Sequence, residues 1–146
     1  MTLSERLSQY RPHALTALRI VTALQYIEHG TQKLFNFPAG AHGGGELPPL
    51  ILTAGILETY GGLLLLVGLF TRPVAFILCG QMAFAYFMAH FQKDFFPANN
   101  GGDAAISFCF IFLYLVFAGP GLLALDNRLY PLFVAFRQWA FDNRRK

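Results

Sequence analysis

Residues Leu50–Phe70 read LILTAGILETYGGLLLLVGLF and contain a single charged side chain, Glu58. A helix needs roughly 20 predominantly apolar residues to cross the hydrocarbon core of a bilayer, and this stretch is long enough to do so. Three further apolar stretches of similar length lie at about residues 14–34, 73–91 and 104–123. The sequence therefore predicts an all-α integral membrane protein, a four-helix bundle formed by residues 1–126.

The composition of the whole chain supports a membrane protein. Of its 146 residues, 55% are hydrophobic and only 13% are charged, whereas a soluble domain carries about 25% charged residues. The net charge of +3 is modest and gives no indication of nucleic-acid binding. Because Arg19, Glu28 and Lys33 interrupt the first apolar stretch, we expect that stretch to be a retained span and not the core of a signal peptide.

The distribution of basic residues predicts the orientation. Cytoplasmic loops of membrane proteins are enriched in Lys and Arg. If both termini are cytoplasmic, the outer side holds only Lys33 and Lys93, both at helix ends. The inner side then holds Arg6, Arg11, Arg72, Arg128, Arg137, Arg144, Arg145 and Lys146. We therefore expect both termini to lie inside.

The last part of the chain, residues 127–146, has the pattern of an amphipathic helix. Its apolar side chains recur on one helical stripe, formed by Leu129, Leu132, Phe133, Phe136 and Ala140. Tyr130 and Trp139 suit the level of the lipid headgroups. This pattern predicts a helix lying on the cytoplasmic membrane surface, not a fifth crossing.

Ionisable side chains within the predicted spans indicate where a site lies, because such groups are costly in lipid and normally face a protein interior or a wet cavity. In the first span one half of the helix is polar and includes Arg19, Gln25, His29 and Lys33. Glu58 shares a face with small residues in the second span. Further polar groups lie near the outer ends of the other spans: Tyr86, His90, Asp103 and Ser107. We predict a polar site in the outer half of the bundle.

Several of these residues also have structural interpretations. Glu58 can form an ion pair with Arg19 or with Lys33, since a buried charge needs a partner, and His29 can hydrogen-bond a carbonyl or Glu58. A haem held by His29 and His90 has no further support in the sequence and is not expected. No metal site is predicted either, and Asp103 can serve as a helix N-cap.

The two cysteines, Cys79 and Cys109, both lie within apolar stretches, where buried thiols are the ordinary interpretation. Helical periodicity places Cys109 opposite the polar face of the fourth span, which argues against a disulfide with Cys79.

Five short patterns resemble the DoxX family of small membrane proteins. They are His29-Gly30-x-x-Lys33, Leu57-Glu58-x-x-Gly61-Gly62, Gly68-x-Phe70-Thr71-Arg72, Pro97-x-Asn99-Asn100-Gly101-Gly102 and Gly119-Pro120-Gly121-x-x-x-Leu125-Asp126. They cover nearly the whole of residues 14–126. One departure is Leu123-Ala124, where the family often has a Tyr-Ser pair.

The resemblance implies a four-helix protein of the bacterial inner membrane, in a family linked to quinone-reducing and thiol-linked redox systems. On that basis we expect an accessory subunit of a membrane redox system that contacts a quinone and a membrane or periplasmic partner protein. Glu58 and His29 would exchange protons with the quinone, while Tyr86, His90, Lys33 and Gln25 would bind it. The alternative is a non-catalytic binding, transport or scaffold protein. Phe-rich helix faces are also compatible with a homo-oligomer.

Overall fold

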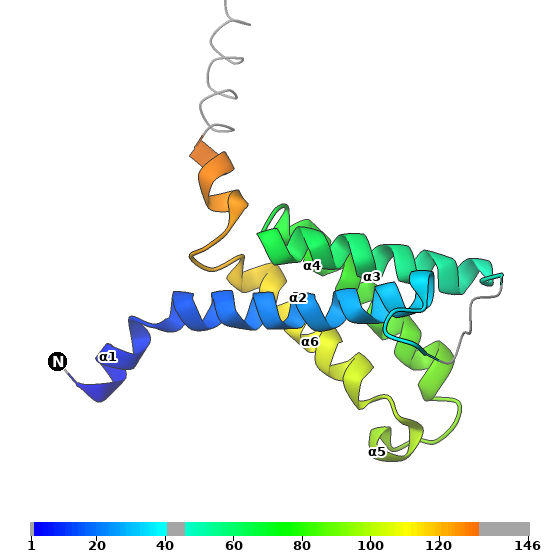
Figure 1. The fold of residues 1–146 in the computed structure, drawn as a ribbon. Helices are drawn as coiled ribbons and strands as arrows, with labels where there is room; N and C mark the ends of the chain where they lie inside the picture. Colours follow the sequence, from blue (N-terminus) through cyan, green and yellow to red (C-terminus); the bar gives the residue numbers. More distant parts are fainter. Residues whose placement is uncertain (1, 41–45, 132–146) are drawn as a thin grey trace, which may run out of the picture.

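The computed structural model describes residues 2–40 and 46–131 (Figure 1). All regular structure in these ranges is helical, which confirms the all-α prediction there. The elements are α1 (Leu3–Ser8), α2 (Arg11–Phe35), α3 (Pro49–Val67), α4 (Thr71–Ala85), the π-helical turn η1 (Tyr86–His90), α5 (Pro97–Asn100) and α6 (Asp103–Ala118). Residues 125–131 are also helical.

Proline and glycine set the ends of the apolar helices. Pro49 begins α3, where its missing N–H costs nothing. Gly68 ends the same helix with a φ of 68°, in the left-handed region that glycine adopts without strain. Gly119 has a φ of 83° and is followed by Pro120, so α6 ends at Ala118. Both helices are therefore shorter at their C-terminal ends than the apolar stretches suggest.

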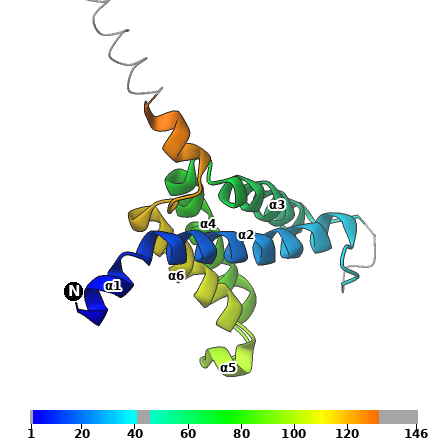
Figure 2. The same ribbon diagram turned by 60° about the vertical axis from the view of Figure 1, so that its left-hand side comes forward.

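The four long helices form two pairs. α2 packs along α3, and α4 packs along α6, while α3 also contacts α4. Successive long helices run in opposite directions, as Figures 1 and 2 show. Glycine permits the close approach of α2 and α3, because a Cβ on Gly62 would lie 2.7 Å from Ile27 Cγ1. Small residues at contacts of this kind are typical of packed membrane helices.

Aromatic side chains connect the two pairs. Tyr26 of α2 is buried, and its ring contacts Phe108 and Phe112 of α6 edge-on, with centroids 5.3 and 4.8 Å apart. Leu78 of α4 and Leu65 of α3 complete the centre of the core. The core thus lies between the pairs.

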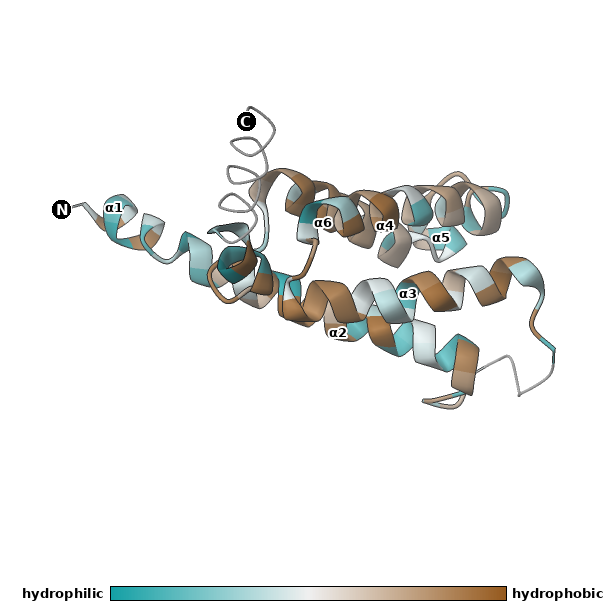
Figure 3. Ribbon diagram, turned by 90° about the horizontal axis from the view of Figure 1, so that it is seen from above, coloured by the Kyte–Doolittle hydropathy of each residue, from teal (hydrophilic) through white to brown (hydrophobic). Residues whose placement is uncertain are grey.

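Two of the predicted crossings have both the length and the apolar composition to span a bilayer. They are α3 and the continuous helix Thr71–His90. α6 is apolar but shorter, and α2 is long but carries Arg19, Glu28 and Lys33. Hydrophobic residues predominate along α3 and α4 in Figure 3, and many large apolar side chains are exposed.

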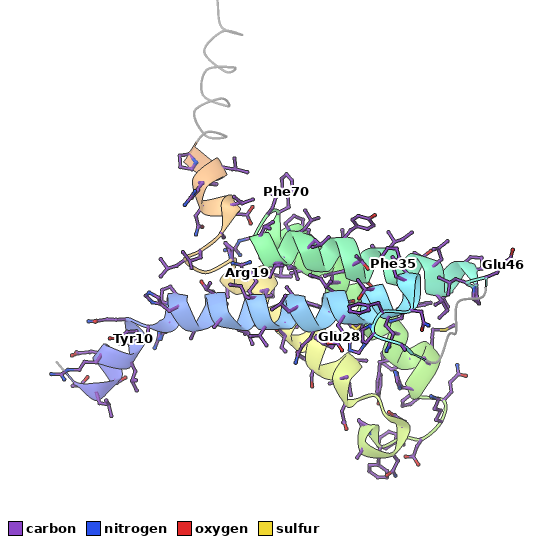
Figure 4. All side chains as sticks on the ribbon, in the orientation of Figure 1. Tyr10, Arg19, Glu28, Phe35, Glu46 and Phe70 are labelled. Atoms are coloured by element: carbon purple, nitrogen blue, oxygen red, sulfur yellow. The ribbon has the colours of Figure 1, made fainter. Side chains whose placement is uncertain are left out.

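At the end of the molecule around Arg19, charged side chains hydrogen-bond the helix ends to one another. We call this the closed end. The buried Arg19 donates to the carbonyls of Leu65, Leu66, Pro120 and Leu123, joining α2 to the end of α3 and to the chain after α6. Figure 4 labels Arg19 at this junction.

Two more charged residues hold the closed end. Arg72 of α4 donates to the carbonyls of Val116 and Phe117 at 2.6 and 2.7 Å. The carboxylate of Asp126 accepts from the backbone N–H groups of Phe70 and Thr71 at 2.7 and 2.8 Å, and so caps α4.

The predicted surface helix is described only at its beginning. Residues 127–131 are helical, and Leu129 and Tyr130 are exposed there. The rest of the predicted helix, residues 132–146, lies outside the described residues, so its amphipathic character stays a prediction.

Candidate functional site

A cavity of about 600 Å³ lies between the two helix pairs, at the end of the molecule away from Arg19. We call this the open end. All four long helices contribute to the cavity through residues between 26 and 33, 50 and 58, 77 and 90, and 104 and 108. Most of the lining is apolar. Its polar side chains are Tyr26, His29, Lys33, Thr53, Glu58, Gln81 and His90. The structure thus brings four of the predicted site residues to one cavity.

The charged centre of the cavity is an ion pair between α2 and α3. Lys33 Nζ lies 2.6 Å from Glu58 Oε2, and the side chain of Glu58 is 5% exposed whereas that of Lys33 is 25% exposed. The second carboxylate oxygen accepts from Gln81 Nε2 of α4 at 3.3 Å. Glu58 therefore connects three helices.

The predicted ion pair between Arg19 and Glu58 is wrong, because the two residues lie at different levels of the molecule. α2 and α3 are antiparallel, and Arg19 lies beside Leu65 and Leu66. Glu58 is seven residues before Leu65 on the same helix, which at 1.5 Å per residue separates the two levels by about 10 Å. The other partner considered for Glu58, Lys33, lies at the matching level.

Two polar atoms of the cavity lining have no hydrogen-bond partner. Within the described residues, four buried side-chain atoms are unpaired, and two of these residues, Tyr26 through its hydroxyl and Gln81 through Oε1, line the cavity. The orientation of the Gln81 amide follows from its contacts, because Nε2 faces two acceptors, Glu58 Oε1 and the carbonyl of Ala54. Buried polar groups normally have partners, and these two atoms, which belong to residues of the cavity lining, have none in the protein.

The two histidines differ in how firmly they are held. His29 is exposed at the cavity, with its ring edge-on to Phe108 at 5.9 Å between centroids. His90 belongs to the π-helical turn, and its Nδ1 lies 3.1 Å from the carbonyl of Asn100. A carbonyl can only accept, so Nδ1 is the donor and Nε2 of the neutral ring is left as an acceptor.

Asn100 fixes the loop that holds His90. Its side chain is buried, donates from Nδ2 to the carbonyl of Asp94 at 2.9 Å and accepts from the N–H of Gly102 at 2.7 Å. A π-helical turn places one extra residue in the helix and is frequent at functional sites. Here it ends α4 at the cavity and carries His90.

Some predicted site residues lie elsewhere. Gln25 is exposed and does not line the cavity, although its helix does. Tyr86 also lies outside the lining, with its hydroxyl 3.5 Å from Asn100 Nδ2. Asp103 and Ser107 are both exposed, because α6 turns its apolar face inward instead. Asp103 is the first residue of α6 and makes no side-chain cap, since Gly102 occupies the N-cap position.

Gln81 was missed by sequence reasoning. It is the only uncharged amide within the helix Thr71–His90, and a polar group inside an apolar span is by itself a signal of function. The sequence does not show that Gln81 donates a hydrogen bond to Glu58, because that contact depends on how α4 packs against α3.

The two cysteines form no disulfide, in line with the expectation, but they lie closer together than the helical periodicity suggests. Cys79 Sγ and Cys109 Sγ lie 3.6 Å apart across α4 and α6, both as free thiols. The cause is the outward rotation of the polar face of α6, which turns Cys109 toward α4. Elsewhere in residues 2–40 and 46–131, no group of three or more His, Cys, Asp or Glu side chains is placed to hold a metal ion.

Comparison with known proteins agrees with the motifs. Residues 14–91, more than half of the chain, match the DoxX family. The chain belongs to the DoxX family. This DoxX protein is therefore a membrane protein, as its composition predicts.

Two curated proteins resemble the chain over nearly their full lengths. An uncharacterized protein of Haemophilus influenzae is 46% identical over 129 residues, which are 85% of this chain and 96% of that protein. The inner membrane protein YphA of Escherichia coli is 29% identical over 128 residues, 81% of this chain and 91% of that protein. No solved structure matches the DoxX protein significantly.

Proposed function

We propose that this DoxX protein is a multi-pass protein of the bacterial inner membrane that binds a quinone in the cavity, as an accessory subunit of a membrane redox system. The observation that carries the proposal is the pairing of an apolar cavity with two unpaired polar atoms, Tyr26 OH and Gln81 Oε1, beside the ion pair of Lys33 and Glu58.

The proposed topology is supported by the distribution of charge and by the packing of the helices. In the proposed arrangement all four long helices cross the bilayer, with the closed end cytoplasmic. The basic residues Arg6, Arg11, Arg72 and Arg128 lie near that end, and Lys33 and Lys93 near the other, as the enrichment of cytoplasmic loops in basic residues requires. A relative named for the inner membrane supports the same location.

The orientation can be tested with single cysteines in a background lacking Cys79 and Cys109. We expect Ala98→Cys, at an exposed position of α5, to react with a membrane-impermeant maleimide in whole cells. In these cells the outer membrane has been permeabilised and the inner membrane is intact. Ser4→Cys, in α1, is expected to react only after the inner membrane is opened. The reverse pattern would contradict the orientation.

The unpaired atoms match the chemistry of a quinone ring. A quinone carbonyl can accept a hydrogen bond from the Tyr26 hydroxyl, and a quinol hydroxyl can donate to Gln81 Oε1. The apolar lining suits the remainder of such a ring, because ligand cavities are mostly apolar with a few orienting polar groups. A small charged solute would lack partners for most of this lining.

The cavity also has an apolar margin on the outside of the molecule. Leu50 of α3, Ile77 and Phe84 of α4, and Met88 of η1 line it, and each is about half exposed. In the proposed topology these side chains face lipid, so a ligand with a long apolar tail can enter from the bilayer. This feature favours a lipid-soluble ligand over a water-soluble one.

Proton exchange would use the groups beside the bound ring. Reduction of a quinone to a quinol takes two electrons and two protons, and oxidation releases them. Of the ionisable side chains in the cavity lining, Glu58 and His29 are the two proposed to accept or donate protons. In the proposed role the electrons come from a partner protein in the membrane or periplasm, while this chain holds and orients the ring.

A second candidate is a non-catalytic binding, transport or scaffold protein. The observation that favours it is the complete pairing of Glu58, which contacts Lys33 and Gln81 and needs no ligand to neutralise its charge. Mass spectrometry of small molecules retained by the purified protein separates the two candidates. A retained quinone supports the redox role, and a different retained solute supports the alternative.

The direct test is quinone binding to the full chain in lipid nanodiscs, measured by equilibrium dialysis with a short-chain benzoquinone. We expect saturable binding that Gln81→Leu weakens about tenfold, the equivalent of roughly 1.4 kcal/mol for one hydrogen bond. Gln25→Leu is the matched control, because that exposed amide lies outside the cavity. Absence of saturable binding, or equal affinities of the two variants, would overturn the proposal.

A further inference from the structure

The contact between α4 and α6 holds a pair of groups that the proposed quinone site does not use. Cys79 and Cys109 are free thiols, each half-buried, with their sulfur atoms 3.6 Å apart. They are the only two cysteines of the chain. Any disulfide within one molecule must therefore join these two residues.

Neither thiol lines the cavity. Ile77 and Gln81 both line the cavity, and Cys79 is two residues from each of them. At about 100° per residue, two residues correspond to roughly half a turn of helix. Cys79 therefore points away from Ile77 and Gln81, although the neighbours Gly80 of α4 and Phe108 of α6 line the cavity.

The surroundings of the pair are apolar, and its position is near the middle of both helices. Both side chains pack against the core cluster that includes Ala75, Leu78 and Met82. Because neither thiol is fully buried, a molecule dissolved in the surrounding lipid can reach them. Water-soluble oxidants are excluded from this depth of a bilayer, whereas lipid-soluble quinones are not.

We propose that Cys79 and Cys109 form a redox-active dithiol, which a quinone from the lipid phase oxidises to a disulfide joining α4 to α6. Both S–H bonds break and one S–S bond forms. The quinone takes up the two electrons and two protons and leaves as a quinol. The sulfurs, now 3.6 Å apart, must approach each other to about 2.05 Å.

The bond would have a consequence for the cavity. α4 and α6 together contribute one wall, including Gln81 and Phe108. A covalent link between the two helices fixes their relative position and so the shape of that wall. The inference rests on the proposed membrane topology but not on the proposed quinone site, because the oxidising quinone need not occupy the cavity.

The test uses the full chain in lipid nanodiscs, reduced and then freed of reductant without oxygen. The oxidant is a ubiquinone analogue with a decyl tail, whose ring positions are all substituted. We expect the intact mass to fall by two hydrogens and both thiols to become unreactive to maleimide after denaturation. Cys79→Ala and Cys109→Ala should each keep one reactive thiol and show no such loss of mass.

The inference is overturned if both thiols of the wild-type protein stay reactive, if its mass rises by that of the quinone, or if the disulfide joins two molecules. Gln81→Leu separates this result from the proposed function. That variant should form the disulfide to the same extent as the wild type while binding quinone more weakly in the cavity. A disulfide that fails to form in wild type while quinone still binds contradicts the dithiol alone.

Discussion

The closed end and the open end of this DoxX protein use charged side chains in different ways. At the closed end Arg19 donates hydrogen bonds to main-chain carbonyls of two segments, the end of α3 and the chain after α6, and Asp126 accepts from two backbone N–H groups. At the open end Lys33 and Glu58 pair with each other beside a cavity. Charged side chains join the helix ends in one region and line a cavity in the other.

The two ends differ in whether their polar atoms are already hydrogen-bonded within the protein. Charged groups of the closed end are hydrogen-bonded to backbone atoms of neighbouring segments, so they are part of the fold. Two polar atoms of the open end, on Tyr26 and Gln81, remain without partners. Substitutions at the closed end should therefore change stability, and substitutions at the open end should change ligand binding.

The largest effect is expected from Arg19→Met. This change removes the donors to four buried or half-buried carbonyls. Because each unpaired buried group costs about 1–3 kcal/mol, the free energy of unfolding should fall by at least ~3 kcal/mol, measured by SDS titration of the solubilised protein. Arg11→Met, at an exposed position, is the control and should change it little. Equal stability of the two variants would contradict the role given to Arg19.

A smaller effect is expected from Lys33→Met at the open end. It leaves the Glu58 carboxylate, 5% exposed, without its cation. The loss should be about 2 kcal/mol, below the roughly 3–5 kcal/mol of a fully buried pair because Lys33 is partly exposed. Glu58→Gln should cost less, since the remaining Lys33 can reach water. The same unfolding titration measures both, and the opposite order would contradict this picture.

Next in size is Asp126→Ala. The carboxylate caps α4 across 55 residues of sequence, and loss of an N-cap costs about 1 kcal/mol. Asp126→Asn keeps one side-chain acceptor and should lie between wild type and Asp126→Ala in the unfolding titration. If both variants match wild type, the cap does not contribute to stability.

The sequence predicts the helices best where local composition alone determines the structure. The apolar runs predict α3 and the helix Thr71–His90 with little error, because length and hydropathy do not depend on neighbours. The choice between Arg19 and Lys33 as the partner of Glu58 depends on the register of two antiparallel helices, and no local pattern contains that register.

The rotation of α6 about its own axis could not be predicted from the sequence either. Asp103 and Ser107 mark a polar face of α6 that points outward, since Phe108 and Phe112 occupy the core against Tyr26. The same rotation brings Cys109 to Cys79. Relative rotation is set by side-chain packing between helices, which the hydropathy of one helix cannot reveal.

Tyr26→Phe should cause the smallest loss of stability. It is also the most direct test of the open end as a quinone site. Its hydroxyl has no partner in the protein, so its removal breaks no hydrogen bond and should not lower the free energy of unfolding. Dialysis with a short-chain benzoquinone should nevertheless show about tenfold weaker binding. Tyr114→Phe, at an exposed tyrosine of α6, should alter neither quantity. Quinone affinity unchanged in Tyr26→Phe, or reduced equally in Tyr114→Phe, would contradict the assignment of the cavity.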